Sequence, residues 1–586
     1  GVLSLPEIAA EITASLDFLE TELRDVPERQ RSVRAAFESS WKRLPADDQQ
    51  AFMKLCVFRG GFTRHAAETV AGARLPVLRH LVNRSFVSAG ADGRFSIHEL
   101  LRQYGLLRAQ QSPADYAQTC LSHSDYYITV LRERAVVIKE HRQQETLADI
   151  AADIDNVRVA WDHAVARRDW PAIDPVAECY WLFCEFRGAL AAGEAAFRHA
   201  LQALAPGAPA RSDPPGDRAA LAGFLMAGAG CLQGRQGNFE AGVAAMQQGI
   251  TWLRGAETPD RQKLSFALAW LAFVLVVQGR YDEAQGYAEE SLSYFPETGD
   301  RWLKAGCLRL TGASHLYRGQ LEDAERTLQS CLAVCEETGE RRIRTYATTN
   351  LGQIALLRGD YPEAQRRLDE ALQITYVLND LLSRAELLRE QARLALLLGD
   401  AQRAEENVEQ SMALYRQIGR RDTGTVLVML GDIRRAQGDT AAAEWLYREG
   451  LERSRAADHR PDIARCLSQW GVLECGRGSY SLAERYQRDA LAIWQGAGNE
   501  VEIAAVQRHL GHILATAGSE RGTEAGQHYA DALALALRHQ LAPVALDVLV
   551  GSAAHLRHTM TAGEAIELLV LAARHPASEI DTRRRA

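Results

Sequence analysis

The sequence of 586 residues lacks the common marks of an enzyme and of a membrane protein. It has no Gly-x-x-x-x-Gly-Lys-Ser/Thr loop, so no cradle for nucleotide phosphates is expected. It has neither a Gly-x-Ser-x-Gly elbow nor a cysteine/histidine signature of a nucleophilic enzyme. It has no signal peptide, and its most apolar run, residues 265–277, is too short to span a bilayer. These absences predict a cytoplasmic chain that is not an enzyme by itself and makes no contact with a membrane.

Disulfides, metal sites and a nucleic-acid coat are also not expected. The ten cysteines are scattered without framework spacing, which is typical of small buried residues in a reducing compartment. Two histidine pairs with helical i,i+3 spacing, His509 with His512 and His555 with His558, have no third ligand nearby. The formal net charge of -9 argues against a chain that coats nucleic acid along its whole length.

What the sequence does have is a motif that returns at a nearly fixed interval. Its clearest copy runs from Gly359 to Ala364, Gly-Asp-Tyr-Pro-Glu-Ala, and a similar frame begins at Gly279, Gly319 and Gly478. Weaker copies begin at Gly188, Gly237, Gly399, Gly438 and Gly518. From Gly279 to Gly518 successive turn glycines are 39 or 40 residues apart. A period in this range predicts a solenoid rather than one globular core.

Each repeat reads as a helix, a turn, a second helix and a second turn. A small residue stands seven positions before each turn glycine and another five positions after it, for example Gly230 and Gly242 around Gly237. Small residues at these places let two helices cross closely, and the glycine suits the left-handed end of the first helix. The second turn carries a glycine too, as at Gly419, or Asn379 or Asp458 in its place.

This pattern resembles the tetratricopeptide repeat with longer helices, because the common unit has about 34 residues. The resemblance covers roughly residues 170–575, and it implies antiparallel helical hairpins stacked into a right-handed superhelix. The predicted fold class is therefore mostly α, with a small N-terminal domain followed by an α-solenoid.

The region from residue 26 to 110 has shorter segments. Helices are predicted at 32–44, 46–57, 63–70 and 76–83, with a turn at 59–62 and Thr63 as a cap. Two short apolar strands flank Ala91-Asp92-Gly93, which predicts a β-hairpin. His98 then opens a helix that runs to Leu107. Helices followed by a hairpin wing predict a winged-helix domain.

These residues carry a second resemblance. The series Arg31-Ser32, Phe58-Arg59-Gly60-Gly61-Phe62 and Ile97 to Tyr104 looks like the winged-helix domain of STAND signal-transduction ATPases, the relatives of NB-ARC proteins and MalT-like regulators. The amphipathic helix at 5–24 then resembles the end of the helical part of the ATPase module, over residues 1–25. Because the chain begins at Gly1 in what resembles mid-domain sequence, it is expected to be part of a longer protein.

The resemblance assigns a role to one residue, His98. In that family a Met-His-Asp-like triplet ends a strand of the winged-helix domain, and its histidine contacts the β-phosphate of ADP in the closed state. Here the triplet is Ile97-His98-Glu99. The alternative is a histidine that only caps or fills the junction between wing and helix. By resemblance the whole protein would use ADP and ATP with Mg²⁺, whereas no cofactor is expected in this chain alone.

The winged-helix region also leaves a DNA-binding alternative open. Between residues 28 and 108 basic residues outnumber acidic ones, and this surplus could meet DNA or an ATPase module. However, the helix at 63–70 offers only Arg64 and His65 for reading bases. Nucleic-acid binding is therefore not the expected function.

A ligand surface is predicted on the inner wall of the superhelix, lined by first-helix residues at fixed offsets from the turn glycines. The expected wall residues are Arg309, Tyr346, Gln353, Arg389, Arg393, Arg435, Arg465, Arg508 and His512. Only Glu386 and Asp432 add acids in the same count, so the groove is expected to be positive. Arginine forks in a concave wall favour an anionic inducer or an acidic peptide. The alternative is that acids of neighbouring helices neutralise these arginines.

The sequence thus predicts a STAND regulatory arm with five parts: 1–25 ending the ATPase module, 26–110 winged helix, 111–170 connecting bundle, 171–575 superhelix and 576–586 tail. The repeats would detect an inducer, and the winged helix would hold the ADP-bound, autoinhibited state of an ATPase module in the same polypeptide. Activation would lead to oligomerisation. The alternatives are a scaffold for protein partners and a DNA-binding transcriptional regulator.

Overall fold

The structure is a computed structural model that describes residues 33–140, 142–206, 216–418, 424–518, 521–556 and 560–586. It divides into two compact units, Gly1–Arg211 and Ser212–Ala586, each of which is described here by itself. The helix predicted at 5–24, the module end expected at 1–25 and Gly419 lie outside the described residues.

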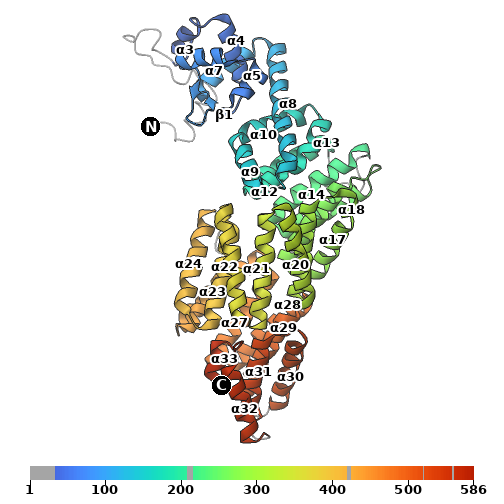
Figure 1. The fold of residues 1–586 in the computed structure, drawn as a ribbon, viewed down its shortest axis with the longest axis vertical. Helices are drawn as coiled ribbons and strands as arrows, with labels where there is room; N and C mark the ends of the chain where they lie inside the picture. Colours follow the sequence, from blue (N-terminus) through green and yellow to red (C-terminus); the bar gives the residue numbers. More distant parts are fainter. Residues whose placement is uncertain (1–32, 141, 207–215, 419–423, 519–520, 557–559) are drawn as a thin grey trace. The chain divides into compact units, whose positions relative to one another are not determined.

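The first unit is mostly helical, with one small sheet (Figure 1). Its elements are α3 (Val33–Trp41), α4 (Ala46–Leu55), β1 (Gly61–Phe62), α5 (Arg64–Ala71), α6 (Leu75–Asn83), β2 (Ser88–Ala89), β3 (Phe95–Ser96), α7 (Glu99–Ala109), α8 (Pro113–Val137), α9 (Gln143–Ala152), α10 (Ile154–Ala166), α11 (Trp170–Ile173), η2 (Asp174–Val176), α12 (Ala177–Phe186) and α13 (Leu190–Leu204).

The sheet adds a strand that the sequence analysis missed. Strands β2 and β3 pair antiparallel, as the hairpin prediction requires, but β1 also pairs with β3, so the order is β1-β3-β2. The residues of β1 include the end of the segment predicted as a turn. Phe62 is fully buried and stacks on Phe58 with ring centroids 4.6 Å apart. Burial of this ring holds the chain extended after Gly60 (φ +68°). The predicted cap is confirmed, since Thr63 accepts a hydrogen bond from the Ala66 amide.

The boundary between the two units differs from the expected domain boundary at 170/171. Helices α12 and α13 cluster with the first unit because Trp161 of α10 joins them. Its ring stacks on Phe197 at 5.6 Å and lies 5.0 Å from Tyr180. The repeat-like glycines of this hairpin suggested that it begins the solenoid, but its aromatic core faces the connecting helices instead.

The second unit is a solenoid of antiparallel helical hairpins (Figure 1). Its elements are η4 (Gly216–Arg218), α14 (Ala219–Arg235), α15 (Phe239–Arg254), α16 (Arg261–Val277), α17 (Tyr281–Ser293), α18 (Phe295–Thr298), α19 (Arg301–Tyr317), α20 (Leu321–Thr338), α21 (Arg341–Arg358), α22 (Tyr361–Leu378), α23 (Leu381–Leu398), α24 (Ala401–Gln417), α25 (Gly424–Ala436), α26 (Thr440–Ala456), α27 (Arg460–Gly476), α28 (Tyr480–Gly496), α29 (Glu500–Ala517), α30 (Gly522–Arg538), α31 (Ala542–His555), α32 (Ala562–Arg574) and α33 (Ile580–Arg585).

The repeat register inferred from small residues is confirmed. The turn glycines from Gly237 to Gly478 all have φ between +78° and +98°, the left-handed region that favours glycine. Asn379 (φ +49°) and Asp458 (φ +47°) take the same conformation at second turns that lack glycine. Gly518 departs from the pattern with φ +146° and ψ 163°.

The small residues at the helix crossings leave no room for larger ones. A Cβ atom on Gly242 of α15 would lie 2.7 Å from the carbonyl oxygen of Gly230 on α14. Ala364, at the equivalent place in α22, is fully buried. We expect Gly242→Ala to lower the free energy of unfolding by about 1 to 3 kcal/mol, because two backbones must separate. Urea denaturation monitored by circular dichroism measures this change.

The matched control for that substitution is Gly286→Ala in α17. An added Cβ there meets nothing within 4 Å, so the greater helix propensity of alanine should raise stability by roughly 0.5 to 1 kcal/mol. If both variants unfold at the same urea concentration, the close crossing at Gly242 does not contribute to stability.

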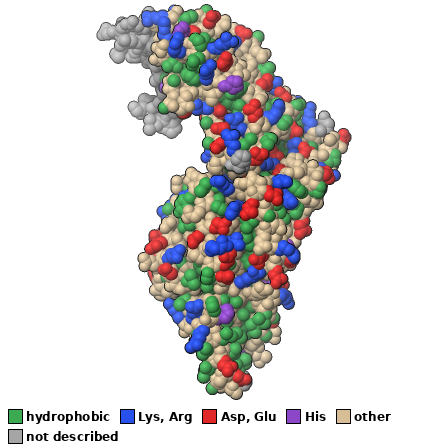
Figure 2. Space-filling model, viewed as in Figure 1, with side chains coloured by type: hydrophobic (Ala, Val, Ile, Leu, Met, Phe, Trp, Pro, Cys, Tyr) green, Lys and Arg blue, Asp and Glu red, His purple; other side chains and the backbone are tan. Residues whose placement is uncertain are grey.

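Arginines on the surface of the solenoid pair with acids of the same or the neighbouring hairpin. Arg254 Nη2 lies 2.6 Å from Glu290 Oε2, and Arg301 Nη1 lies 2.9 Å from Glu337 Oε2. Arg521 Nη1 lies 2.5 Å from Glu484 Oε2. Figure 2 shows the resulting mixture of acidic and basic side chains on the visible face. No helix among the described residues is long and apolar enough to cross a membrane.

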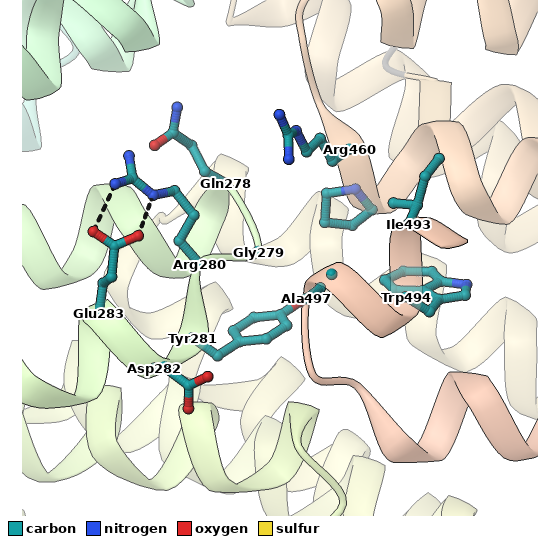
Figure 3. A pocket seen from close by; sticks show the side chains of 12 residues that line it. Gln278, Gly279, Arg280, Tyr281, Asp282, Glu283, Arg460, Ile493, Trp494 and Ala497 are labelled. Atoms are coloured by element: carbon teal, nitrogen blue, oxygen red, sulfur yellow. Dashed lines mark hydrogen bonds and ion pairs between the residues drawn. The ribbon is translucent and has the colours of Figure 1, made fainter. Parts of the chain in front are cut away.

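The solenoid coils so far that one superhelical turn touches the next. The turn at Gly279 lies against Pro461 of α27, and the turn at Gly319 lies against Val501 of α29 and His539. Figure 3 shows the first of these contacts, where Tyr281 and Gly279 face Trp494, Ile493 and Ala497 across a cleft of about 120 Å³.

Candidate functional site

The coil surrounds a partly open cavity of about 780 Å³, here called the central cavity. Its wall comes mainly from the first helices of successive hairpins, α19, α21, α23, α25, α27, α29 and α31, with α33 added at one end. Leucine, valine, isoleucine and methionine side chains alternate with charged ones along this wall. A volume of this size is typical of sites for small molecules and short peptide segments.

The structure brings most of the predicted wall residues together. Those that line the central cavity are Gln353, Arg389, Arg393, Arg435, Arg465, Arg508 and His512. They lie on the first helices, where their offsets from the turn glycines had placed them. Their role in ligand binding stays a prediction.

Two predicted wall residues, Arg309 and Tyr346, are not part of the cavity lining. The guanidinium of Arg309 lies over the rings of Tyr346, at 5.3 Å, and Phe273, at 5.7 Å. Tyr346 Oη accepts a hydrogen bond from Ser383 Oγ at 3.0 Å. Burial lowers the pKa of Arg309. These residues form a separate cation–aromatic cluster on the adjoining helices.

The charge of the wall is more balanced than the sequence count predicted. Of the two acids counted there, Asp432 lines the cavity and Glu386 does not. The structure adds carboxylates from Glu390, Glu502, Asp547, Glu579 and Asp581, and guanidiniums from Arg584 and Arg585. The expectation of few acids was wrong because three of these carboxylates come from the last hairpin and the tail, which the repeat count did not reach.

Several wall arginines have carboxylate partners. Arg465 Nη2 lies 3.4 Å from Glu502 Oε1, and Arg389 Nη2 lies 3.4 Å from Glu390 Oε1. These contacts run between first helices of neighbouring hairpins or along one helix. They satisfy part of the hydrogen-bonding capacity of each guanidinium.

Other polar groups of the wall remain without partners among the described residues. Arg393 lines the cavity and makes no hydrogen bond and no ion pair there, although its charge acts on Asp432 and Glu579. The buried Nε atoms of Arg435 and Arg508 and the Oε2 atom of Glu390 also have no hydrogen-bond partner. Unsatisfied buried polar atoms are uncommon in folded proteins and often mark a functional site.

The most elaborate cluster surrounds Asp547 of α31. Its Oδ2 atom lies 2.9 Å from His512 Nε2 and 3.4 Å from Arg508 Nη1. Its Oδ1 atom accepts hydrogen bonds from Thr582 Oγ1 at 2.8 Å and from Arg585. The side chain of Asp547 is only 2% exposed. This carboxylate therefore joins α29, α31 and α33.

Burial and neighbouring charge set the pKa values in this cluster. Burial alone would raise the pKa of Asp547, but Arg508, His512 and Arg585 together hold it well below the ordinary value. Burial lowers the pKa of His512 and, more strongly, that of His509. Burial raises the pKa of Glu579, against the opposing charge of Arg508. At neutral pH the cluster thus pairs an ionised Asp547 with neutral histidines and charged arginines.

His98 lies in the first unit, exposed at the start of α7. Its Nδ1 atom accepts a hydrogen bond from the Leu100 amide at 3.3 Å, which makes it the N-cap of that helix. The next residue, Glu99, pairs with Arg102 through two hydrogen bonds of 2.7 Å. The capping alternative is therefore realised in this structure, and a nucleotide role stays a prediction.

Metal and thiol chemistry find no support in the described residues. They contain no group of three or more histidine, cysteine, aspartate or glutamate side chains that could hold a metal ion. All ten cysteines are free, and eight of them are buried. Burial raises the pKa of Cys307 and Cys466 to about 12, so these thiols are poor nucleophiles.

Comparison with known proteins identifies the repeats. Residues 264–337, 305–376, 343–417, 383–456 and 422–496 each match the tetratricopeptide repeat family. These matches cover the hairpins from α16 to α28 and confirm the repeat interpretation there.

A putative HTH-type transcriptional regulator of Mycobacterium tuberculosis is 29% identical to this chain over 165 residues. That match covers 26% of this chain and 18% of the relative, so the chain matches less than a fifth of the relative's length.

Two solved structures show more distant likenesses. One is a Signal Transduction ATPase with Numerous Domains (STAND) protein with a tetratricopeptide repeat sensor from Pyrococcus horikoshii, with 13% identity and a TM-score of 0.26 over 96% of this chain and 68% of that one. The other is the Rap conjugation gene regulator of the plasmid pLS20 in complex with the Phr* peptide, with 12% identity and a TM-score of 0.44 over 65% of this chain and 98% of that one. TM-scores of this size do not establish a shared arrangement of domains.

Proposed function

We propose that this chain is the regulatory and sensor arm of a STAND signal-transduction ATPase, and that its repeats bind an inducer in the central cavity. The observation that carries the proposal is the cavity itself, surrounded by helical hairpins and lined by apolar side chains and by polar groups without partners. A scaffold that docks proteins on its outside would not need a partly charged cavity inside. The repeats would then act as the detector, with the first unit as the element that responds.

The unpartnered groups define the chemistry of the ligand. Arg393 makes no ion pair or hydrogen bond among the described residues, although its charge acts on Asp432 and Glu579, and the buried Nε atoms of Arg435 and Arg508 have no acceptor. Burial raises the pKa of Asp432, against the opposing charge of Arg435. A carboxylate or phosphate at this place would gain charge-assisted hydrogen bonds. Apolar side chains such as Leu356, Leu397 and Met429 would hold the body of the same ligand.

We therefore propose an amphipathic anionic ligand, with an acidic peptide segment as the first choice. The test is a titration of fluorescein-labelled hexapeptides that combine leucine with aspartate or glutamate, followed by fluorescence anisotropy. Saturable binding that weakens with added salt is expected, because the arginine contacts are electrostatic. Absence of saturable binding by every acidic hexapeptide would count against the proposal.

For the first unit we propose the winged-helix role that its sequence suggests. The order of helices and the β2–β3 hairpin before α7 support this interpretation. His98 is exposed, so its imidazole is free to reach a phosphate on a neighbouring ATPase module of the same polypeptide. In this scheme ADP holds the closed state, and inducer binding favours nucleotide exchange and oligomerisation.

In a longer protein that contains the ATPase module, His98→Ala is expected to shorten the retention of ADP by about tenfold. The reason is that one charge-assisted hydrogen bond, worth about 1.5 to 3 kcal/mol, is lost in the closed state only. Release of a fluorescent ADP analogue measures the effect. The variant His98→Asn keeps a side chain that can cap α7. Equal retention of ADP by both variants and by the parent would show that His98 is structural.

A further inference from the structure

The tail segment, residues 576–586, does not behave as a loose extension of the repeats. Ala577, Ser578 and Thr582 are buried, although the rest of the segment is mostly charged. Its helix α33 supplies Glu579, Ile580, Asp581, Arg584 and Arg585 to the lining of the central cavity. The sequence analysis predicted a C-terminal tail at 576–586 beyond the superhelix. The structure instead makes this segment part of the cavity wall.

The segment is held at two places on the wall. At its beginning, Ala577 lies against the turn glycine Gly359, and its carbonyl oxygen accepts a hydrogen bond from Tyr361 Oη at 2.9 Å. The first residue of α33, Ile580, lies against Gly399. A Cβ atom on this glycine would lie 2.9 Å from Ile580 Cγ1. Two turn glycines of the middle repeats thus form shallow sockets for small or apolar side chains.

At its far end the segment inserts a guanidinium into the Asp547 cluster. Arg585 donates to Asp547 Oδ1, and its Nη1 atom lies 3.2 Å from His512 Nε2. Thr582 Oγ1 donates to the same carboxylate oxygen at 2.8 Å. Side chains of one short helix thereby satisfy a buried acid that belongs to the repeat wall.

A simple capping role does not account for these contacts. A terminal cap of a solenoid covers the open apolar face of the last hairpin and presents a polar outer face. Helix α33 contacts α31 and α32 of the last hairpin and, in addition, α23, which belongs to a hairpin far away in the sequence. Exposed apolar side chains remain on α32 at Ile566, Val570 and Leu571, so one face of the last helix before the segment stays uncovered.

We propose that the tail segment is an intramolecular occupant of the ligand site, and that the wall from Gly359 and Gly399 to Asp547 is a recognition site for a segment with an apolar anchor and an arginine. The segment binds in cis and closes one end of the central cavity. A ligand that enters from this end must first release Arg585 from Asp547. The bound segment thereby raises the ligand concentration that the sensor needs. The reason is that a segment of the same chain competes at a high effective concentration.

This inference rests on the proposed function only through the shared cavity, and its test uses the chain's own sequence as the probe. A fluorescein-labelled peptide of residues 576–586 is titrated into the unchanged chain and into the variant Ile580→Ser with Arg585→Ala. The variant weakens both anchors of the cis segment and leaves Gly359, Gly399 and Asp547 intact. We expect the variant to bind the peptide at least tenfold more tightly than the unchanged chain, because its cis competitor is weaker.

The matched control is a peptide that carries the same two substitutions, which is expected to bind the variant chain at least tenfold more weakly than the unchanged peptide. Hydrogen–deuterium exchange gives a second readout, in which amides of α33 should exchange at least tenfold faster in the variant while those of α19 to α22 stay unchanged. Equal peptide affinity of both chains, or equal affinity of both peptides, would overturn the proposal. The failure of acidic hexapeptides to bind would leave this result unaffected.

Discussion

Replacing Asp547 with alanine is expected to lower the stability of the last hairpins by about 3 to 5 kcal/mol, because a buried ion pair is broken by the removal of one partner. Arg508, whose side chain is 13% exposed, would lose its carboxylate partner. Thr582 and Arg585 would lose the acceptor that holds α33. Hydrogen–deuterium exchange of α29, α31 and α33 measures the loss by region, which suits a solenoid whose repeats open locally.

The control for this substitution is Asp581→Ala, on the same helix that Asp547 holds. The Asp581 side chain is 60% exposed, so its removal should change stability by less than about 0.5 kcal/mol. Similar exchange rates in the two variants would show that the Asp547 cluster does not organise the end of the solenoid.

Acid should weaken the same hairpins. The pKa of His512 is lowered in the folded state, so stability begins to fall as pH drops below the ordinary histidine value of about 6.5. The pKa of Asp547 is also lowered, so its contribution is present above about pH 4 and declines as pH falls further. The Asp547→Ala variant should lack the second part of this decline.

Changing Arg389 and Arg393 together to glutamate is expected to weaken the binding of acidic peptides by about 100-fold or more. Each charge-assisted hydrogen bond is worth about 1.5 to 3 kcal/mol, and about 1.4 kcal/mol corresponds to a factor of ten in affinity. Both residues line the central cavity, and Arg393 makes no hydrogen bond or ion pair among the described residues. Anisotropy titration with the labelled acidic hexapeptides measures the change.

The matched control is Arg326→Glu with Arg403→Glu, which makes the same charge change on the second helices α20 and α24. Both side chains are exposed and neither lines the cavity. Peptide affinity should change by less than about threefold, because solvent screens charges at that distance. If this control loses as much affinity as the wall variant, net charge rather than the cavity governs binding.

The single change Arg393→Gln separates recognition from folding. Arg389 already pairs with Glu390, so its reversal also disturbs a contact along α23. Arg393 has no such contact to lose, and its neutralisation should lower peptide affinity by about tenfold while α23 keeps its exchange protection.

The sequence by itself determined the helical hairpins and their register. The turn glycines, like Asn379 and Asp458, adopt a left-handed backbone conformation. This conformation depends on a few neighbouring residues, so the turns could be predicted from the spacing of these residues. The small residues Gly230 and Gly242 predicted a close crossing for the same reason. The offsets that placed Arg393 and Arg465 on the inner wall followed from helical periodicity alone.

Only the tertiary structure decided which distant repeats meet. Gly359 and Gly399 read as ordinary turn residues, but the coil brings them against Ala577 and Ile580 of the tail segment. Asp547 lies on an irregular hairpin without a turn glycine, so no offset could place it beside Arg508 and Arg585. The curvature of the coil is the sum of small rotations between repeats, and local sequence patterns do not fix that sum. The charge balance of the cavity and the docking of the tail segment both follow from this curvature.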